Sequence, residues 1–225
     1  MMFLSNENVL VVAAHPDDEV LGMGGTIHKL SLLGSRVRVI FLSDGVSSRN
    51  QERESLENRR LSALNALGLL NCNDVCFYDY PDNSMDSIPL IQVINTIEMN
   101  VKNFEPTVIF THFPNDLNVD HRITSQATLV ASRPKVQSKI KFLFYFEVQS
   151  STEWNFGANQ FNPNLFIDIS GSIQQKKASL KEYQVEMDEF PEARSVDGVE
   201  ARNTVRGITI GVPSAEAFQI GFMRV

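Results

Sequence analysis

Residues 8–25 read NVLVVAAHPDDEVLGMGG, and this stretch decides the fold. The apolar run at 8–14 predicts a strand that is buried on both faces of a parallel sheet. Apolar residues then recur at helical spacing over 19–34, where Gly34 suits the end of a helix. Between the strand and the helix stand a histidine and three consecutive carboxylates. This cluster indicates either a helix N-terminus with acidic capping residues or a site for a cation.

The same alternation continues along the chain. Further strands are predicted at 36–45, 74–80, 107–113 and 140–148, and further helices at 51–68, 88–104 and 120–133. Short connections between alternating strands and helices predict an α/β fold, with a Rossmann-like, mostly parallel sheet and helices on both faces. We expect the core strands in the order 3-2-1-4-5. One side of the amphipathic helix at 51–68 carries Leu56, Leu61, Leu64 and Leu67.

Beyond residue 150 the pattern loosens. A strand at 166–170 and a helix at 172–187 are predicted, and the residues after them show no clear periodicity. Since the chain has no linker and no repeat, we expect one domain over 1–225. It consists of a core at about 1–150 and a C-terminal α/β extension at about 151–225.

Composition limits the class of protein. The chain has 225 residues, of which 43% are hydrophobic, and a formal net charge of −7. Without a run of Lys and Arg it lacks the basic surface that nucleic-acid binding requires. The N-terminal residues show no signal peptide and no apolar run long enough to span a bilayer, so we expect a cytoplasmic protein without stable membrane insertion. Cys72 and Cys76 are expected to be reduced thiols, and the sequence leaves open whether the chain forms a homo-oligomer.

A second polar cluster, THFPNDLNVDHR at 111–122, follows the fourth predicted strand. It contains His112, Asp116, Asp120 and His121. In the expected strand order, strands 1 and 4 flank the point where the order reverses, and ligands bind there beyond the carboxyl ends of the strands. We therefore expect the two polar clusters to meet in one crevice.

Histidines and carboxylates gathered in one crevice indicate a particular chemistry. Two imidazoles with one or two carboxylates favour zinc over calcium or magnesium, and this ligand set also accepts iron(II). A catalytic zinc site keeps an open position for water, and a further carboxylate beside it can take the proton of that water. The pattern therefore predicts metal-assisted hydrolysis of an acyl bond.

The stretch AHPDDEVLGMGGT followed by THFPNDLNVDHR resembles the LmbE-like (PIG-L-like) zinc-dependent N-acetylglucosaminyl deacetylases. The resemblance implies Zn²⁺ held by His15, Asp18 and His121, with Fe²⁺ as the alternative metal. It implies Asp17 as the general base, so that the two adjacent aspartates have separate roles. It also implies a reaction in which a zinc-bound water removes the N-acetyl group from an amino sugar or a sugar conjugate.

One position departs from the family pattern. Many members have a histidine three residues before the second histidine ligand, and this chain has Asn118 there. An amide can still donate a hydrogen bond to the oxyanion of the intermediate, so Asn118 is one catalytic candidate. Asp120 is another, and it either orients its neighbours or caps the helix that follows.

Three further residues are candidates for binding the substrate. Asp44 and Glu147 stand at the ends of the second and fifth predicted strands and suit sugar hydroxyls, although a turn cap suits Asp44 equally. Arg194, with Arg202 and Arg206 in the same tail, suits either an anionic group or a surface contact.

Two other features have both a functional and a structural interpretation. Trp154 is either a platform on which a sugar ring stacks or a residue of the core. The glycines of GMGG at 22–25 lack the spacing of a nucleotide-binding loop, so close helix packing is the preferred interpretation.

The sequence leaves three functions open. The first is deacetylation of an N-acetylated sugar, the second is hydrolysis of another small amide, and the third is binding of a metal or a sugar without turnover. The substitution Asp17→Asn separates them, because an enzyme should keep its metal and lose its activity, whereas a binding protein should keep its ligand affinity.

Overall fold

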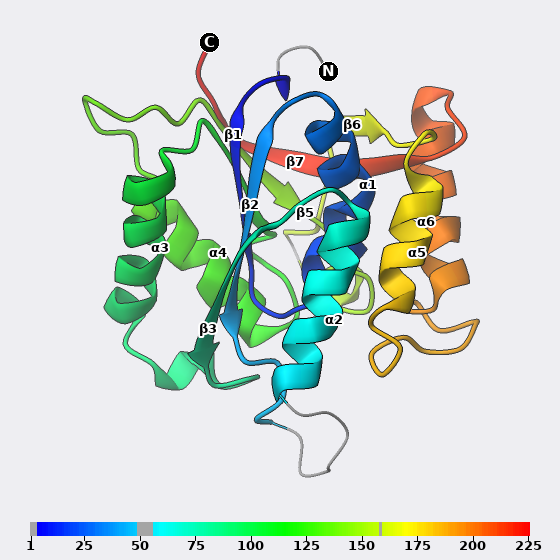
Figure 1. Cartoon of the computed structure of the whole chain (residues 1–225), viewed down its shortest axis with the longest axis horizontal. Helices are drawn as coiled ribbons and strands as arrows, with labels where there is room; N and C mark the ends of the chain where they lie inside the picture. Colours follow the sequence, from blue (N-terminus) through cyan, green and yellow to red (C-terminus); the bar gives the residue numbers. More distant parts are fainter. Residues whose placement is uncertain (1–3, 49–55, 158) are drawn as a thin grey trace.

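The structure is a computed structural model that describes residues 4–48, 56–157 and 159–225. Within these ranges the strands are β1 (Asn8–Ala13), β2 (Arg36–Ser43), β3 (Asp74–Tyr80), β4 (Val108–His112), β5 (Phe142–Phe146), β6 (Leu165–Asp168) and β7 (Ala215–Met223). The helices are α1 (Asp18–Leu32), α2 (Leu56–Leu69), α3 (Leu90–Phe104), α4 (Val119–Ala131), α5 (Ile173–Lys181) and α6 (Val196–Ile210), with short 3₁₀ helices η2 (Met85–Ser87) and η3 (Thr152–Trp154). The described strands form a seven-stranded sheet in the order β3-β2-β1-β4-β5-β7-β6 (Figure 1).

The predicted core order 3-2-1-4-5 is confirmed. β1 lies between β2 and β4, and the pairs β1–β2, β1–β4, β2–β3 and β4–β5 are all parallel. The extension continues the same sheet, because β7 pairs antiparallel with both β5 and β6. The helix expected at 172–187 ends at Lys181, and α6 and β7 lie in the tail that showed no clear periodicity. β7 is fully buried in its first half and partly exposed in its second, so no single period describes it.

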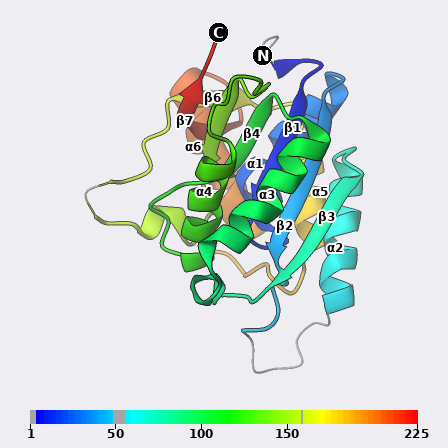
Figure 2. The same ribbon diagram turned by 90° about the vertical axis from the view of Figure 1, so that its left-hand side faces the viewer.

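Helices cover both faces of the sheet, as expected. α3 and α4 lie on one face, and α1, α2, α5 and α6 lie on the other (Figure 1 and Figure 2). Alternate side chains of β1 join two core clusters: Val9 and Val11 pack on the α1 side, whereas Leu10 and Val12 pack on the α3 side. Burial on both faces therefore explains the continuous apolar run of this strand. None of the described helices combines the length and the apolar character that crossing a membrane requires.

The helix predicted at 51–68 is α2 from Leu56 onward, and residues 51–55 lie outside the described part of the chain. The predicted leucine side is buried only in part, since Leu67 is buried whereas Leu61 and Leu64 are 55% and 46% exposed. The buried residues of α2 are Arg59, Ala63, Ala66 and Leu67. Small alanine side chains let α2 approach α5 closely enough for a hydroxyl of α5 to donate to a carbonyl of α2.

The glycines of GMGG lie inside α1, which is kinked at Met23. A Cβ atom at Gly22 would lie 2.6 Å from the ring of Phe146, and one at Gly25 would lie 2.8 Å from the side chain of Ile169. Both glycines thus allow α1 to approach β5 and the segment after β6. Their interpretation as packing residues is confirmed.

Cys72 and Cys76 are free thiols with different surroundings. Burial raises the pKa of Cys72 to about 12 and also raises the pKa of the half-buried Cys76. Because the thiolate is the reactive form, Cys72 should react about a thousandfold more slowly at pH 8 than an ordinary thiol.

We therefore expect an aromatic disulfide reagent at pH 8 to modify Cys76 first and to leave Cys72 unmodified until the protein unfolds. The Cys76→Ser variant should show no fast-reacting thiol in the native state and one in denaturant. Two thiols that react at the same rate in the native protein would contradict the burial of Cys72.

Candidate metal centre

The carboxyl ends of β1 and β4 lie side by side because the two strands pair in parallel. The polar clusters that follow them meet at this edge of the sheet, in the crevice expected from the strand order. Oδ2 of Asp18 lies 3.2 Å from Nδ1 of His15 and 3.3 Å from Nε2 of His121. The ligand atoms of these three buried residues all lie within 4.8 Å of one another. The structure thus brings together the three residues predicted to hold a metal.

Two imidazole nitrogens and one carboxylate oxygen fit the predicted metals, because zinc and iron(II) both accept this donor set. Each imidazole is also held by its other nitrogen. Nε2 of His15 lies 3.0 Å from Asp120 and 3.2 Å from Asp82. Nδ1 of His121 lies 3.0 Å from Asp116. Carboxylates in these positions fix the orientation and the tautomer of a metal-binding histidine.

The carboxylates around the two imidazoles raise the imidazole pKa values. Burial alone would lower them, but hydrogen bonds to Asp120 and Asp18 hold the pKa of His15 well above its ordinary value. Burial is likewise the largest single effect on His121, but the charges of Asp18 and Asp116 and the hydrogen bonds to them together outweigh it and raise the pKa of His121 to about 9. In turn His121 holds the pKa of Asp18 well below its ordinary value, against the effect of burial. The centre therefore favours positive charge, which a metal cation can supply in place of protons.

Asp17 stands between β1 and α1 with a φ of 127°, which residues other than glycine rarely adopt. Such strain persists where the surroundings enforce it, and it is common at active sites. The Asp17 side chain makes no capping hydrogen bond to α1; its carboxylate lies 3.3 Å from Arg59 and contacts Arg194. Burial raises the pKa of Asp17, and the two arginines act in the opposite direction. Asp17 thus adjoins the candidate metal ligands without being one of the three clustered residues.

Glu19, the third carboxylate of the motif, holds the backbone. Its Oε2 accepts the N–H of Asp17 at 3.0 Å, and its Oε1 accepts the hydroxyl of Tyr183 at 2.6 Å. Burial raises the pKa of Glu19 to about 8. Three consecutive carboxylates therefore have three different environments.

His112 lies in the second cluster but outside the group of ligand atoms. Its Nε2 accepts the N–H of Ala14 at 2.8 Å, and its ring stacks on that of His121 with centroids 3.9 Å apart. Burial holds the pKa of His112 well below its ordinary value, so the ring is neutral. His112 therefore supports the ring of His121.

Asn118 and Asp120 begin α4 and hold different parts of the site. Oδ1 of Asn118 accepts the N–H of Asp120 at 2.8 Å and that of His121 at 3.3 Å, so Asn118 is the N-cap of α4. Its Nδ2 donates to Asn83 at 3.0 Å. The carboxylate of Asp120 accepts the N–H of Asn83 at 2.7 Å and contacts His15. Of the two interpretations of Asp120, these contacts match the one in which it orients its neighbours.

Comparison with known protein families identifies the family to which this chain belongs. The sequence profile of the PIG-L family, described as GlcNAc-PI de-N-acetylase, matches residues 10–132, which is more than half of the chain. The chain belongs to this family. The matched segment contains both polar clusters and all three clustered ligands.

The relatives of this PIG-L-family chain include named deacetylases. The uncharacterized deacetylase YaiS of Escherichia coli K12 is 26% identical over 132 residues, which are 56% of this chain and 69% of that protein. A probable N-acetyl-alpha-D-glucosaminyl L-malate deacetylase 2 of Bacillus cereus is 27% identical over 146 residues, which are 59% of this chain and 65% of that protein. The structure of N,N'-diacetylchitobiose deacetylase from Pyrococcus horikoshii shares the fold with a TM-score of 0.77, over 95% of this chain and 83% of that chain, at 21% identity.

In this PIG-L-family protein the candidate metal centre opens into a cavity of about 290 Å³. Besides His15 and His121, its lining comprises Asp17, Gly45, Arg59, Asp82, Asn83, Leu117, Asn118, Ser150, Ser151, Glu186 and Arg194. Most of these side chains are polar or charged, which suits a ligand rich in hydroxyl groups.

Of the residues predicted to bind substrate, Arg194 lines this cavity, whereas Asp44 and Glu147 do not. Oδ1 of Asp44 accepts the N–H of Val46 at 3.0 Å, so Asp44 closes a turn. Glu147 forms a bidentate ion pair with Arg206 at 2.7 and 2.8 Å.

Sequence patterns missed Arg59, Asp82 and Glu186, which line the cavity. Asp82 follows β3 by two residues, and the rule that ligands meet the carboxyl ends of strands would have included it. Arg59 reaches from α2 to Glu186 at 2.7 Å. A buried arginine in a polar helix leaves no pattern to recognise, because its burial depends on packing between distant segments.

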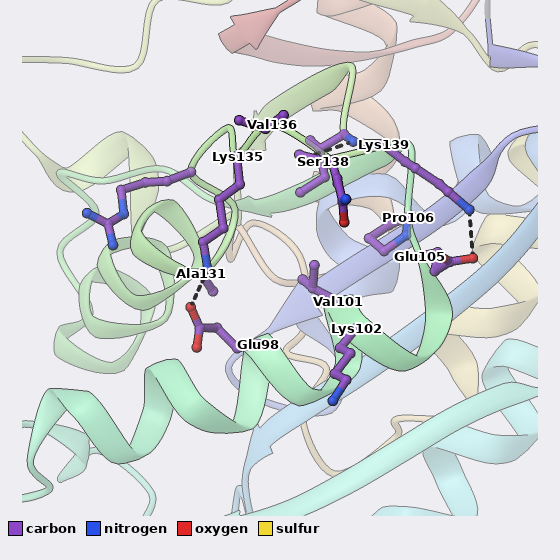
Figure 3. Close-up of a pocket in the computed structure, with 13 residues that line it drawn as sticks. Glu98, Val101, Lys102, Glu105, Pro106, Ala131, Lys135, Val136, Ser138 and Lys139 are labelled. Atoms are coloured by element: carbon purple, nitrogen blue, oxygen red, sulfur yellow. Dashed lines mark hydrogen bonds and ion pairs between the residues drawn. The ribbon is translucent and has the colours of Figure 1, made fainter.

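A larger groove of about 590 Å³ lies at the opposite edge of the sheet, near the amino ends of β4 and β5 (Figure 3). Two of its lysines are paired with acids: Lys135 lies 3.4 Å from Glu98, and Lys139 lies 2.8 Å from Glu105. Among the described residues its lining includes no histidine and no aspartate. The smaller cavity is therefore the better candidate for chemistry.

Proposed function

We propose that this protein is a metal-dependent hydrolase that removes the N-acetyl group from an amino sugar or a sugar conjugate. The observation that carries the proposal is the pairing of the His15, Asp18 and His121 cluster with a separate buried carboxylate, Asp17, in one polar cavity. Membership of the PIG-L family and the named deacetylases among its relatives support the same reaction class.

Each residue of the site then has a task. Nδ1 of His15, Nε2 of His121 and the carboxylate of Asp18 would hold the metal, with Zn²⁺ as the first candidate and Fe²⁺ as the second. The chemistry that such a cation supplies is Lewis acidity, which lowers the pKa of water toward ~7 and polarises an acyl oxygen. Asp17 takes a proton from the attacking water at its carboxylate and returns it to the nitrogen of the leaving amine.

The arginines and the amide complete the site. Arg59 and Arg194 contact Asp17 and keep its carboxylate in place. Asn118 lines the cavity with its amide, from which it can donate a hydrogen bond to the developing oxyanion. Since an amide cannot act as an acid, proton return falls to Asp17.

The test is release of primary amine from a panel of N-acetylated sugars and sugar nucleotides. Metal-stripped protein should be inactive, and one equivalent of Zn²⁺ or Fe²⁺ should restore turnover of at least one substrate. Silence across the panel with tightly bound metal would instead favour another small amide or a protein that binds without turnover. Silence without metal binding would overturn the metal centre itself.

The variant His121→Ala should lose metal and roughly a thousandfold in kcat/KM, because the metal stabilises the transition state by several kcal/mol. His28→Asn is the control. His28 lies on α1, its ring is hydrogen-bonded to Ser172, and it is not part of the cavity lining. Equal metal content in the two variants would contradict the assignment of His121 as a ligand.

A further inference from the structure

A second hollow adjoins the catalytic cavity. This outer pocket has a volume of about 350 Å³ and is formed around Leu117, Arg122, Trp154, Asn115, Asn155 and Asn159. Leu117 belongs to the lining of both hollows, so the two adjoin at this side chain. Because Leu117 is 56% exposed, a molecule that is bound in the catalytic cavity and is long enough to cross this side chain would reach the outer pocket.

Two large apolar side chains, Leu117 and Trp154, line the outer pocket without being buried, and Phe156 packs on Trp154. Leu117 is 56% exposed, Trp154 is 57% exposed and Phe156 is 75% exposed. Phe156 meets the indole of Trp154 edge to face, with ring centroids 5.3 Å apart. Trp154 is therefore not a core residue, and a cluster of exposed apolar groups beside a polar cavity is typical of a binding site.

The turn that carries Trp154 is tied to the metal centre. The hydroxyls of Ser151 and Thr152 donate to Oδ2 of Asp116 at 3.2 and 2.5 Å, and Oδ1 of the same carboxylate contacts His121. Trp154 follows directly in the short helix η3. The turn that carries the indole thus has a defined position relative to His121.

The asparagines close the other side of the pocket. Nδ2 of Asn155 donates to the carbonyl of Asn115 at 2.6 Å and to that of Asn159 at 2.9 Å. Nη1 of Arg122 donates to the carbonyls of Asp116 and Leu117. These bonds fix the shape of the pocket, which favours binding because little ordering is required.

We propose that the outer pocket binds a second sugar ring, joined to the ring that carries the N-acetyl group. An indole offers a flat apolar surface for the C–H face of a pyranose, and amide and guanidinium groups around it offer hydrogen bonds to hydroxyls. The substrate class is then a disaccharide or longer glycoside, not a free amino sugar. The identity of the reacting group rests on the proposed function, but binding at the outer pocket does not.

Fluorescence tests binding directly, because Trp154 is the only tryptophan of the chain. The Asp17→Asn variant loaded with Zn²⁺ is used so that the probes are bound but not hydrolysed. It is titrated with three probes: N-acetylglucosamine, its β-1,4-linked N-acetylated disaccharide, and octyl N-acetylglucosaminide. We expect the disaccharide to shift Trp154 emission to the blue, since it would cover an exposed ring, with a Kd about tenfold below that of the monosaccharide. No response to the disaccharide, or an equal response to the octyl glycoside, would overturn the assignment to a sugar ring.

Kinetics give a second readout. The ratio of kcat/KM for the disaccharide to that for the monosaccharide should fall about tenfold in Trp154→Ala and recover in Trp154→Tyr. Leu32→Ala, an exposed apolar position at the far end of α1, is the control and should leave the ratio as it is. A ratio that does not fall in Trp154→Ala would contradict the outer pocket. Absence of amine release from every sugar would reject the proposed function alone, because the fluorescence titration still tests the pocket.

Discussion

Asp17→Asn is expected to lower kcat by about a thousandfold while the protein keeps its metal. Loss of a general base typically reduces a rate by about 10²- to 10⁴-fold. Asparagine has nearly the shape of aspartate, but it cannot accept a proton from water at neutral pH. Asp17 contacts Arg59 and Arg194 and is not one of the three clustered ligand residues, so its charge can be removed without taking a ligand from the metal.

The measurement combines amine release with elemental analysis of the purified variant. Asp44→Asn is the matched control, because Asp44 closes a turn outside the cavity lining, and its kcat should stay within about twofold of the parent. If Asp17→Asn lost metal together with activity, the separate roles of the two adjacent aspartates would be wrong. If the parent protein showed no activity and Asp17→Asn left ligand affinity unchanged, the chain would be a binding protein.

Lys176→Ala is expected to destabilise the fold by about 3–5 kcal/mol, the largest stability effect that we predict. Lys176 is completely buried on α5 and lies 2.7 Å from Glu216 of β7. It also donates to the carbonyl of Leu21, and Glu216 accepts the N–H groups of Gly25 and Thr26 at 2.9 and 2.7 Å. Without the lysine, the buried carboxylate of Glu216 would lose the ammonium group that it is paired with.

Urea unfolding of the two neighbouring lysine variants tests this directly. Lys177→Ala is the matched control, because the pair that Lys177 forms with Glu200 is partly exposed and such pairs contribute about 1 kcal/mol or less. Lys176→Ala should lower the midpoint of unfolding far more than Lys177→Ala does. Similar midpoints for the two variants would show that the extension is not tied to α1 through this ion pair.

The sequence by itself determined the features that depend on neighbours along the chain. The run at 8–14 had to be a central strand, because a continuous apolar segment of that length is stable only where both faces are covered. His15, Asp17 and Asp18 fall within four residues, so one turn places them together. His121 is more than a hundred residues away, yet strand order alone predicted where it would lie, because the carboxyl ends of adjacent parallel strands share one edge.

Tertiary structure decided which of several similar side chains does what. The three carboxylates at 17–19 have the same chemistry in sequence, but one faces Arg59, one faces the imidazoles and one faces Tyr183. Likewise Leu61 and Leu64 of α2 are exposed, because α5, which comes later in the chain, packs beside Ala66 instead.

The cavity residues that sequence patterns did not predict also depend on tertiary contacts. Arg59, Asp82 and Glu186 come from three separate segments and meet only in the folded cavity. The sequence around Trp154 is compatible with both a core and a surface position. In the structure Asp116 holds the turn at 150–154, and Trp154 is exposed on it. Periodicity reports which face of an element is buried against its own sheet, whereas the partner of a long polar side chain depends on contacts between distant segments, which no local pattern records.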